Sequence, residues 1–358
     1  MRPANTLNRR EFLAAVGPGS SLARSALAAP LLPLTLRFSG SGKKQILRVL
    51  ESPRSHISAP IPIRVDAVAM REYMALISQP PGDTDDRIEP LARLLYSQMW
   101  GPIRRIPLSY RAVNILAEDD FVQFAFEALR GERQWIGRAA AIHYLIKELS
   151  TSSTSLRPLI SNRANYAYTP FGEGKSGILW AAREGRLVAK LTHGELRAGS
   201  RATKSQLLDD IGRPFGIIHI ATHGLDPDGC PNTACIALHR AESSTHRERW
   251  YDALQAADLN SMRIDGRLVV LSACASDGTS PQDLSVRFVD RGVREVISSR
   301  FVGLDDAAAF TFMARFYEEL KLGANSGTAL LRARSVMIDG SYPAYKHPYF
   351  WAAFQSFV

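Results

Sequence analysis

Two predominantly apolar runs, 216–221 and 268–272, constrain the fold of this chain more than any other feature. Neither run alternates polar with apolar residues, so each predicted strand must be covered on both of its faces. Helices are predicted at residues 250–257, at 281–290 and from 305 to 322. Buried strands that alternate with helices are typical of a parallel sheet with helices on both faces. We therefore expect an α/β fold, a three-layer α/β/α sandwich with a mainly parallel central sheet.

Other apolar segments predict more elements of the same kind. Short strands are expected at residues 112–116, 141–146 and 293–298, and an aromatic strand at 349–358. Helical spacing of apolar residues predicts further helices at 85–100, 205–211 and 325–337. The helix that begins at Asp305 or Asp306 should end at Gly323, because glycine readily adopts the backbone conformation that ends a helix.

The composition excludes several classes of protein. Of the 358 residues, 46% are hydrophobic and 22% are charged, which is ordinary for a globular protein and excludes a disordered or fibrous chain. No apolar stretch reaches the roughly 18–20 residues of a membrane-spanning helix. Three cysteines are too few for a disulfide scaffold. We expect one large domain or two small ones.

The net charge of +9 is unevenly distributed along the chain. Residues 1–40 contain five arginines and one glutamate, and the rest of the chain has no dense run of lysine and arginine. Nucleic-acid binding normally needs such a run, often interleaved with aromatic residues. We therefore expect no nucleic-acid partner.

The first 40 residues resemble a twin-arginine export signal. Arg9 and Arg10 precede Phe12 and Leu13, and residues 26–28, Ala-Leu-Ala, are a candidate cleavage site. The alternative is an untethered basic tail, so we expect either a cytoplasmic protein or one exported to the periplasm or the cell exterior.

The chain is expected to divide into three parts. Residues 1–40 form the signal or tail, and residues 41–87 form a linker and N-terminal extension. The stretch 39–62 is rich in proline, serine and glycine, which is typical of a linker. Residues 88–358 contain the α/β domain.

Reactive residues follow the two apolar strands. His223 comes after the first strand and Cys274 after the second, and small residues flank both. Ligands of parallel sheets bind outside the carboxyl ends of the strands. A cysteine nucleophile needs a base or a positive charge beside it, and imidazole is such a base. The histidine precedes the cysteine by about 50 residues, the order and spacing known from caspases.

Several segments together resemble the CHAT family of caspase-like domains. They are residues 218–224 (Ile-His-Ile-Ala-Thr-His-Gly), 268–274 (Leu-Val-Val-Leu-Ser-Ala-Cys), 290–299 (Asp-Arg-Gly-Val-Arg-Glu-Val-Ile-Ser-Ser), 305–306 (Asp-Asp) and 347–354 (His-Pro-Tyr-Phe-Trp-Ala-Ala-Phe). Residues 124–129 and 141–145 are similar to landmarks in the first half of the family. The resemblance covers residues 88–358.

The resemblance implies a caspase-like fold and a cysteine endopeptidase with a His-Cys dyad. It assigns the base to His223, the nucleophile to Cys274, and the oxyanion hole to the backbone N–H groups of Gly224 and Cys274. It implies a protein or peptide substrate, a regulatory protein partner in some members, and no cofactor or metal. The alternative function is a non-catalytic interaction module that keeps the fold and binds a partner in the groove.

This sequence departs from the family pattern near the expected substrate groove. The loop at residues 276–281 is short, and the usual Ser-Leu-Trp turn is Ser299-Arg300-Phe301. Relatives that cleave after arginine or lysine often have an acidic residue two positions before the nucleophile. Here that residue is Ser272, which argues against a preference for basic residues.

Other histidines and cysteines have structural interpretations. His219 lies inside its strand and should be a hydrogen-bonded core residue. His193 repeats the Thr-His-Gly tripeptide of His223 but follows a segment interrupted by a lysine, so we expect it on the surface. Cys230 and Cys235 can form a disulfide if the protein is exported. They lack a second pair of ligands at metal spacing, so no zinc site is expected.

Overall fold

The structure is a computed structural model that describes residues 34–42, 44–50, 59–83, 85–103, 112–146, 163–171, 178–225, 235–240, 251–273, 282–301 and 303–358. The described strands are β1 (Leu34–Ser39), β2 (Gln45–Leu50), β3 (Ile61–Ile63), β4 (Ala112–Ala117), β5 (Ala141–Tyr144), β6 (Ala164–Thr169), β7 (Glu195–Ala198), β8 (Phe215–Thr222), β9 (Cys235–His239), β10 (Tyr251–Gln255), β11 (Gly266–Ala273), β12 (Glu295–Ser299) and β13 (Phe354–Phe357). The described helices are α2 (Ala67–Ile77), α3 (Ile88–Met99), α4 (Ile136–Ala139), α5 (Leu179–Thr192), α6 (Lys204–Ile211), α7 (Gln282–Arg291), α8 (Asp306–Lys321), α9 (Ser326–Asp339) and α10 (Pro348–Trp351).

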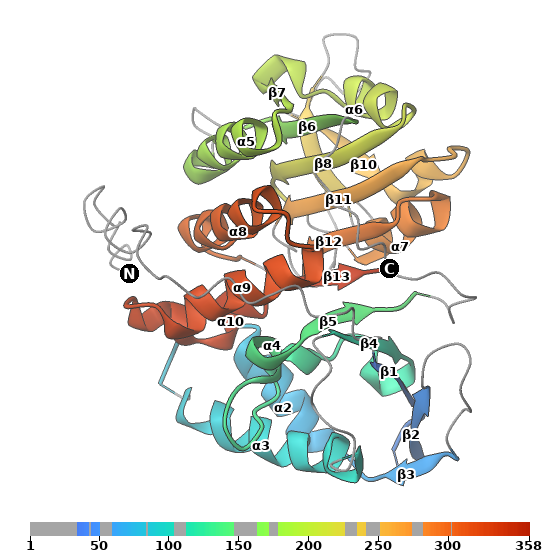
Figure 1. Ribbon diagram of the computed structural model, residues 1–358, viewed down its shortest axis with the longest axis vertical. Helices are drawn as coiled ribbons and strands as arrows, with labels where there is room; N and C mark the ends of the chain where they lie inside the picture. The colour runs from blue at the N-terminus through green and yellow to red at the C-terminus, as the bar shows by residue number, and fades with distance from the viewer. Residues whose placement is uncertain are drawn as a thin grey trace.

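One sheet runs the length of the molecule (Figure 1). Its order among the described residues is β3-β2-β1-β4-β5-β13-β12-β11-β8-β6-β7. The four strands β6, β8, β11 and β12 are mutually parallel, and every residue of β8 is buried. The continuous apolar runs thus occupy the middle of the sheet, where both faces are covered.

Helices cover both faces of this central region. Helix α5 packs against α8 on one face (Figure 1). Helix α5 connects β6 to β7, whereas α6 connects β7 to β8 and α7 connects β11 to β12, in the opposite direction along the sheet. Because such connections are right-handed, α6 and α7 lie on the face opposite to α5. The predicted α/β/α sandwich with a mainly parallel sheet is confirmed. No helix in the described ranges is both long and apolar enough to span a bilayer.

The two halves of the sheet run in opposite directions. Strand β13 is antiparallel to β12, and it is parallel to β5, which is in turn parallel to β4. The carboxyl ends of β4 and β5 therefore lie at the sheet edge opposite to the carboxyl ends of β8 and β11. Strands β4 and β5 extend the sheet, but their carboxyl ends do not lie at the edge where His223 lies.

The linker prediction for residues 39–62 is wrong for the described part, and Leu34–Ser39 also belongs to the fold. Strands β1 and β2 pair with each other, and β1 joins β4. Their residues alternate between buried and half-buried positions: Leu34, Leu36 and Phe38 in β1 face the core, as do Leu47 and Val49 in β2. This period of two is the mark of a strand. Residues 1–33 lie outside the described residues, so the export signal stays a prediction.

Two other predicted elements differ from the structure. The segment predicted as a helix at 250–257 contains strand β10, which pairs with β9 and so satisfies its backbone groups in a hairpin. The aromatic segment 349–358 begins with the short helix α10, because Pro348 occupies a first-turn position where its missing N–H is not needed. Only Phe354–Phe357 forms the strand.

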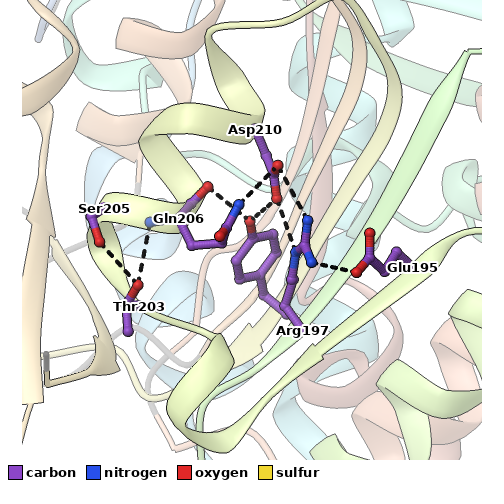
Figure 2. Close-up of polar contacts among 7 residues, drawn as sticks. Glu195, Arg197, Thr203, Ser205, Gln206 and Asp210 are labelled. Carbon is purple, nitrogen blue, oxygen red and sulfur yellow. Dashed lines mark hydrogen bonds and ion pairs between the residues drawn. The ribbon is translucent and has the colours of Figure 1, made fainter.

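A buried carboxylate holds the edge strand β7 onto the sheet. Asp210 of α6 is fully buried and accepts hydrogen bonds from the Tyr168 hydroxyl, from Arg197 Nε at 3.2 Å and from Gln206 Nε2 at 3.2 Å. Arg197 also pairs with the exposed Glu195, and Figure 2 shows the guanidinium between the two carboxylates. Asp210 is therefore the common acceptor that joins β6, β7 and α6.

We expect Asp210→Asn to lower the free energy of unfolding by about 2–4 kcal/mol, because it leaves the largely buried Arg197 without its buried counter-charge. Glu195→Gln is the matched control, since it removes the exposed carboxylate from the same guanidinium and should cost less than about 1 kcal/mol. Urea unfolding of both variants measures the difference. Equal losses in the two variants would show that Asp210 does not anchor the edge strand.

Candidate active site at the carboxyl ends of two central strands

Strands β8 and β11 end side by side. They are adjacent and parallel, and their register pairs Ala273, the last residue of β11, with Thr222, the last residue of β8. His223 is the next residue after Thr222. Cys274 is the next residue after Ala273 and lies outside the described residues. The chain therefore leaves both strands at the same edge of the sheet.

The position of His223 is fixed by its main chain and by an aromatic neighbour. Its carbonyl accepts a hydrogen bond from the N–H of Ala237 at 3.0 Å, and Thr222 Oγ1 donates to the Ala237 carbonyl at 2.6 Å. The imidazole packs at 5.8 Å from the ring of Phe171. His223 is half-buried, so strand β9 holds its backbone while part of the residue stays exposed.

Gly224 presents its N–H away from β9. Gly224 forms an antiparallel bridge with Ile236. The hydrogen bonds lie on either side of this pair: the Leu225 N–H donates to the Cys235 carbonyl, and the Ala237 N–H donates to the His223 carbonyl. This is the pattern of a non-hydrogen-bonded pair, in which the two residues do not bond to each other. Within the described part of the chain, the Gly224 N–H donates to no other group.

A pocket of about 200 Å³ opens beside His223. It lies between the carboxyl ends of the central strands and the amino-terminal turns of α5 and α8. It is lined by Ile178, Ala181, Glu184, Ala221, Thr222, His223, Ser272, Ala273, Ser299, Leu304, Asp306, Ala309 and Phe354. Among the residues that the structure describes, this lining contains two carboxylates and no lysine or arginine.

Asp306 is the first residue of α8, and it also caps α5. Its carboxylate accepts a hydrogen bond from the N–H of Trp180 at 2.7 Å and another from the N–H of Ala181. The residue in the N-cap position of α5 makes no side-chain cap of its own. Burial raises the pKa of Asp306 to about 6; the bond from Trp180 opposes this rise, and the negative charges of Glu184 and Asp305 add to it.

Glu184 is the second carboxylate of the pocket, on α5, and it is 1% exposed. Its Oε1 lies 2.9 Å from His219 Nε2, an ion-pair distance, yet neither atom makes a hydrogen bond of acceptable geometry with the described residues. His219 Nδ1 lies 3.0 Å from the Tyr317 hydroxyl, and His219 is fully buried. The interpretation of His219 as a hydrogen-bonded core residue is confirmed.

His193 lies far from this edge of the sheet. It is exposed, ends α5 with a φ of 52°, and precedes β7, so it lies near the amino ends of the parallel strands. The surface position expected from the sequence is confirmed.

The structure describes one of the two remaining cysteines. Cys235, the first residue of β9, is disulfide-bonded. Disulfides persist in oxidising compartments. Cys230 lies outside the described residues, so the Cys230–Cys235 pair stays a prediction. The described ranges contain no group of three or more histidine, cysteine, aspartate or glutamate side chains suited to a metal ion.

The unusual turn after β12 changes the pocket less than the sequence suggested. Ser299 lines the pocket, but the Arg300 side chain is buried elsewhere, 3.0 Å from Glu127 and 2.6 Å from Gln355. Phe301 is buried and stacks on Tyr349 with ring centroids 5.9 Å apart. The short loop at residues 276–281 lies outside the described residues.

Sequence reasoning does not find the two pocket carboxylates. From the sequence, Asp306 is only a helix start and a family landmark, and Glu184 carries no motif. The available signal is a single acidic residue among the small residues Ala181, Ala182 and Gly185 on one helix.

Comparison with known families identifies the group to which the chain belongs. The family model of the CHAT domain matches residues 89–357, which is most of the chain. The chain belongs to the CHAT family. This membership agrees with the caspase-like, cysteine-peptidase type of fold expected from the sequence. Strands β1–β3 precede the matched range and extend the CHAT-family sheet at one edge.

Solved structures similar to this CHAT-family chain include two of one bacterial proteinase. One is the Arg-specific cysteine proteinase gingipain R, with a TM-score of 0.46 and 10% identity over 72% of this chain and 65% of that chain. The other is the complex of the pro- and mature domains of RgpB from Porphyromonas gingivalis, with a TM-score of 0.46 and 10% identity over 80% of this chain and 75% of that chain. The chain thus spans 65% of the length of the first structure. No curated protein sequence matches this chain.

Proposed function

We propose that this CHAT-family chain is a cysteine endopeptidase in which His223 is the general base and Cys274 the nucleophile. The observation that carries the proposal is the pairing of Ala273 with Thr222, because the next residue of each strand is then a member of the dyad. The exposed part of His223 and the pocket beside it support the proposal, since a substrate needs access to the base.

In the first step, His223 takes the proton of the Cys274 thiol, and the thiolate sulfur attacks the carbonyl carbon of the peptide bond. A carbon–sulfur bond forms, and the carbonyl oxygen becomes an oxyanion. The N–H groups of Gly224 and Cys274 are the proposed donors to that oxygen, and one such donor contributes roughly 3 kcal/mol to transition-state stability. The carbon–nitrogen bond then breaks as the imidazolium of His223 protonates the leaving amine.

In the second step, water hydrolyses the acyl-enzyme. His223 removes a proton from the water molecule, whose oxygen attacks the thioester carbon. The carbon–sulfur bond breaks, and the products are a carboxylic acid and the regenerated thiol. The overall reaction consumes one water molecule and balances without an oxidant or a reductant.

Digestion of an unbiased peptide library tests this function directly. The wild-type protein should produce new amino termini at a reproducible set of sites, detected by mass spectrometry. Cys274→Ala should produce none under the same conditions. A wild-type protein that leaves the library intact, and that a thiol-directed covalent peptide probe does not label, would instead support a non-catalytic interaction module.

A further inference from the structure

We propose that the pocket lined by Glu184 and Asp306 binds the cationic side chain, arginine or lysine, of the substrate residue that precedes the cleaved bond. This inference rests on the proposed peptidase function for the reaction, and on the pocket alone for the choice of ligand. Neither carboxylate belongs to the dyad or to the oxyanion hole.

The location of the pocket indicates which substrate residue enters it. Its lining includes His223 and Ala273, the residue directly before Cys274. The nucleophile attacks the carbonyl of the residue on the amino side of the cleaved bond. The side chain of that residue begins at Cβ, two bonds from the attacked carbon, so the nearest pocket is the one that receives it.

The charges of the pocket select a cation. Glu184 and Asp306 line it, and His223 is the one other titratable group among the described lining residues. The N–H donors that Asp306 accepts from α5 are neutral, so they leave its negative charge uncompensated. Glu184 is almost fully buried, and its Oε1 lies 2.9 Å from His219 Nε2 but lacks a well-aligned hydrogen bond within the described ranges. A buried carboxylate without a full set of donors is unfavourable, and a guanidinium or ammonium group would satisfy it.

The size and walls of the pocket fit a long side chain with a charged end. Its volume of about 200 Å³ is below the roughly 300–1,000 Å³ of small-molecule sites. Apolar residues form much of its wall, among them Ile178, Ala181, Leu304 and Ala309. Arginine and lysine bury an aliphatic stem against apolar surface while their charged end meets a polar group.

The absence of an acidic residue at Ser272 therefore does not exclude basic specificity. Ser272 lines the pocket, but the acidic groups come from two helices instead, α5 and α8. These helices pack against each other on one face of the sheet (Figure 1). Their packing brings together two carboxylates that are far apart in the sequence.

Two peptides that differ only in arginine or citrulline before the cleaved bond test the proposal, because citrulline has nearly the shape of arginine but no charge. The wild-type protein should hydrolyse the arginine peptide with a kcat/KM roughly 10- to 100-fold higher, the range expected for hydrogen bonds between charged groups. Glu184→Gln and Asp306→Asn should each reduce this ratio several-fold. Asp306→Asn keeps an oxygen that can still cap α5, so it should fold even if Glu184→Gln does not.

Asp305→Asn is the matched control, since it removes an exposed carboxylate next to Asp306 and keeps an N-cap oxygen for α8. It should change the arginine-to-citrulline ratio by no more than about twofold. Equal hydrolysis of the two peptides by the wild-type protein would overturn the proposal while leaving the peptidase function intact.

A binding measurement separates the pocket from the chemistry. N-acetyl-arginine amide should bind to Cys274→Ala more tightly than N-acetyl-citrulline amide, and Asp306→Asn in the same background should reduce the difference several-fold. If the wild-type protein hydrolyses no peptide but this binding preference is present, the pocket assignment stands and the peptidase proposal fails. If neither amide is preferred, the pocket assignment fails.

The arginine-to-citrulline ratio should also depend on pH. Because the pKa of Asp306 is about 6, its charge is present above that pH and is lost below it, so the ratio should fall as the pH decreases from 7.5 through 6. Asp306→Asn should show no such fall near pH 6, and a ratio that stays flat in the wild-type protein would contradict the assignment.

Discussion

Replacing His223 with alanine should lower kcat/KM for peptide hydrolysis at least ~100-fold, the effect typical of losing a general base. Without the imidazole, the Cys274 thiol loses the proposed acceptor of its proton, and the leaving amine loses the acid that protonates it. The effect should fall on kcat/KM for every peptide, because the base acts on the nucleophile and not on the substrate side chain. Initial rates with one peptide from the library digest measure it.

His193→Ala is the matched control for this experiment. Both histidines stand in a Thr-His-Gly tripeptide, but His193 is exposed at the end of α5, near the amino ends of the strands. Its removal should change kcat/KM by less than about twofold, as expected for a surface substitution. A large loss in His193→Ala together with a small loss in His223→Ala would show that the site lies at the other edge of the sheet.

Replacing Cys274 with serine should abolish turnover, with a loss of at least ~1,000-fold, because loss of a nucleophile removes the covalent step. A serine hydroxyl is close in volume to the thiol but is a far weaker nucleophile beside the same base. The urea midpoint of the variant should match that of the wild type, which separates chemistry from folding. Cys230→Ser should retain most of the turnover, and the opposite pattern would remove Cys274 from the proposed role.

The central sheet was predictable because its strands are apolar on both faces. Strands β8 and β11 contain few polar residues, so they need cover on both sides. The ends of the later helices were also predictable from local chemistry. Asp305 caps α8 by accepting from the Ala308 N–H, and Gly323 follows the helix with a φ of 89°.

The sequence analysis does not predict strands β1 and β2, because the linker-like composition around them is a stronger local signal than their alternation of buried and half-buried residues. Proline, serine and glycine surround β1 and β2 and are typical of a linker, but the apolar residues of both strands recur at every second position. The sequence predicts a helix where β10 forms, because its partner strand β9 is not evident from local sequence. Pairing with a distant segment decides such cases, and propensity alone does not.

The site was predictable to the extent that it depends on strand ends. His223 was found because it follows an apolar run, and its place at the end of β8 agrees with that reasoning. The pocket carboxylates could not be found in the same way. Glu184 and Asp306 meet only because α5 packs against α8, and no local pattern in the sequence encodes that contact.

Alkylation of Cys274 at pH 6 tests the dyad most directly. The protein is treated with iodoacetamide in its native state and after unfolding in urea, and mass spectrometry follows the adduct on Cys274. A thiolate paired with His223 should have a pKa below the ordinary value of ~8.5, so Cys274 should react faster in the native protein than in the unfolded one. His223→Ala should remove this advantage. Slower reaction of Cys274 in the native protein, unchanged by His223→Ala, would contradict the assignment of the two residues as a catalytic pair.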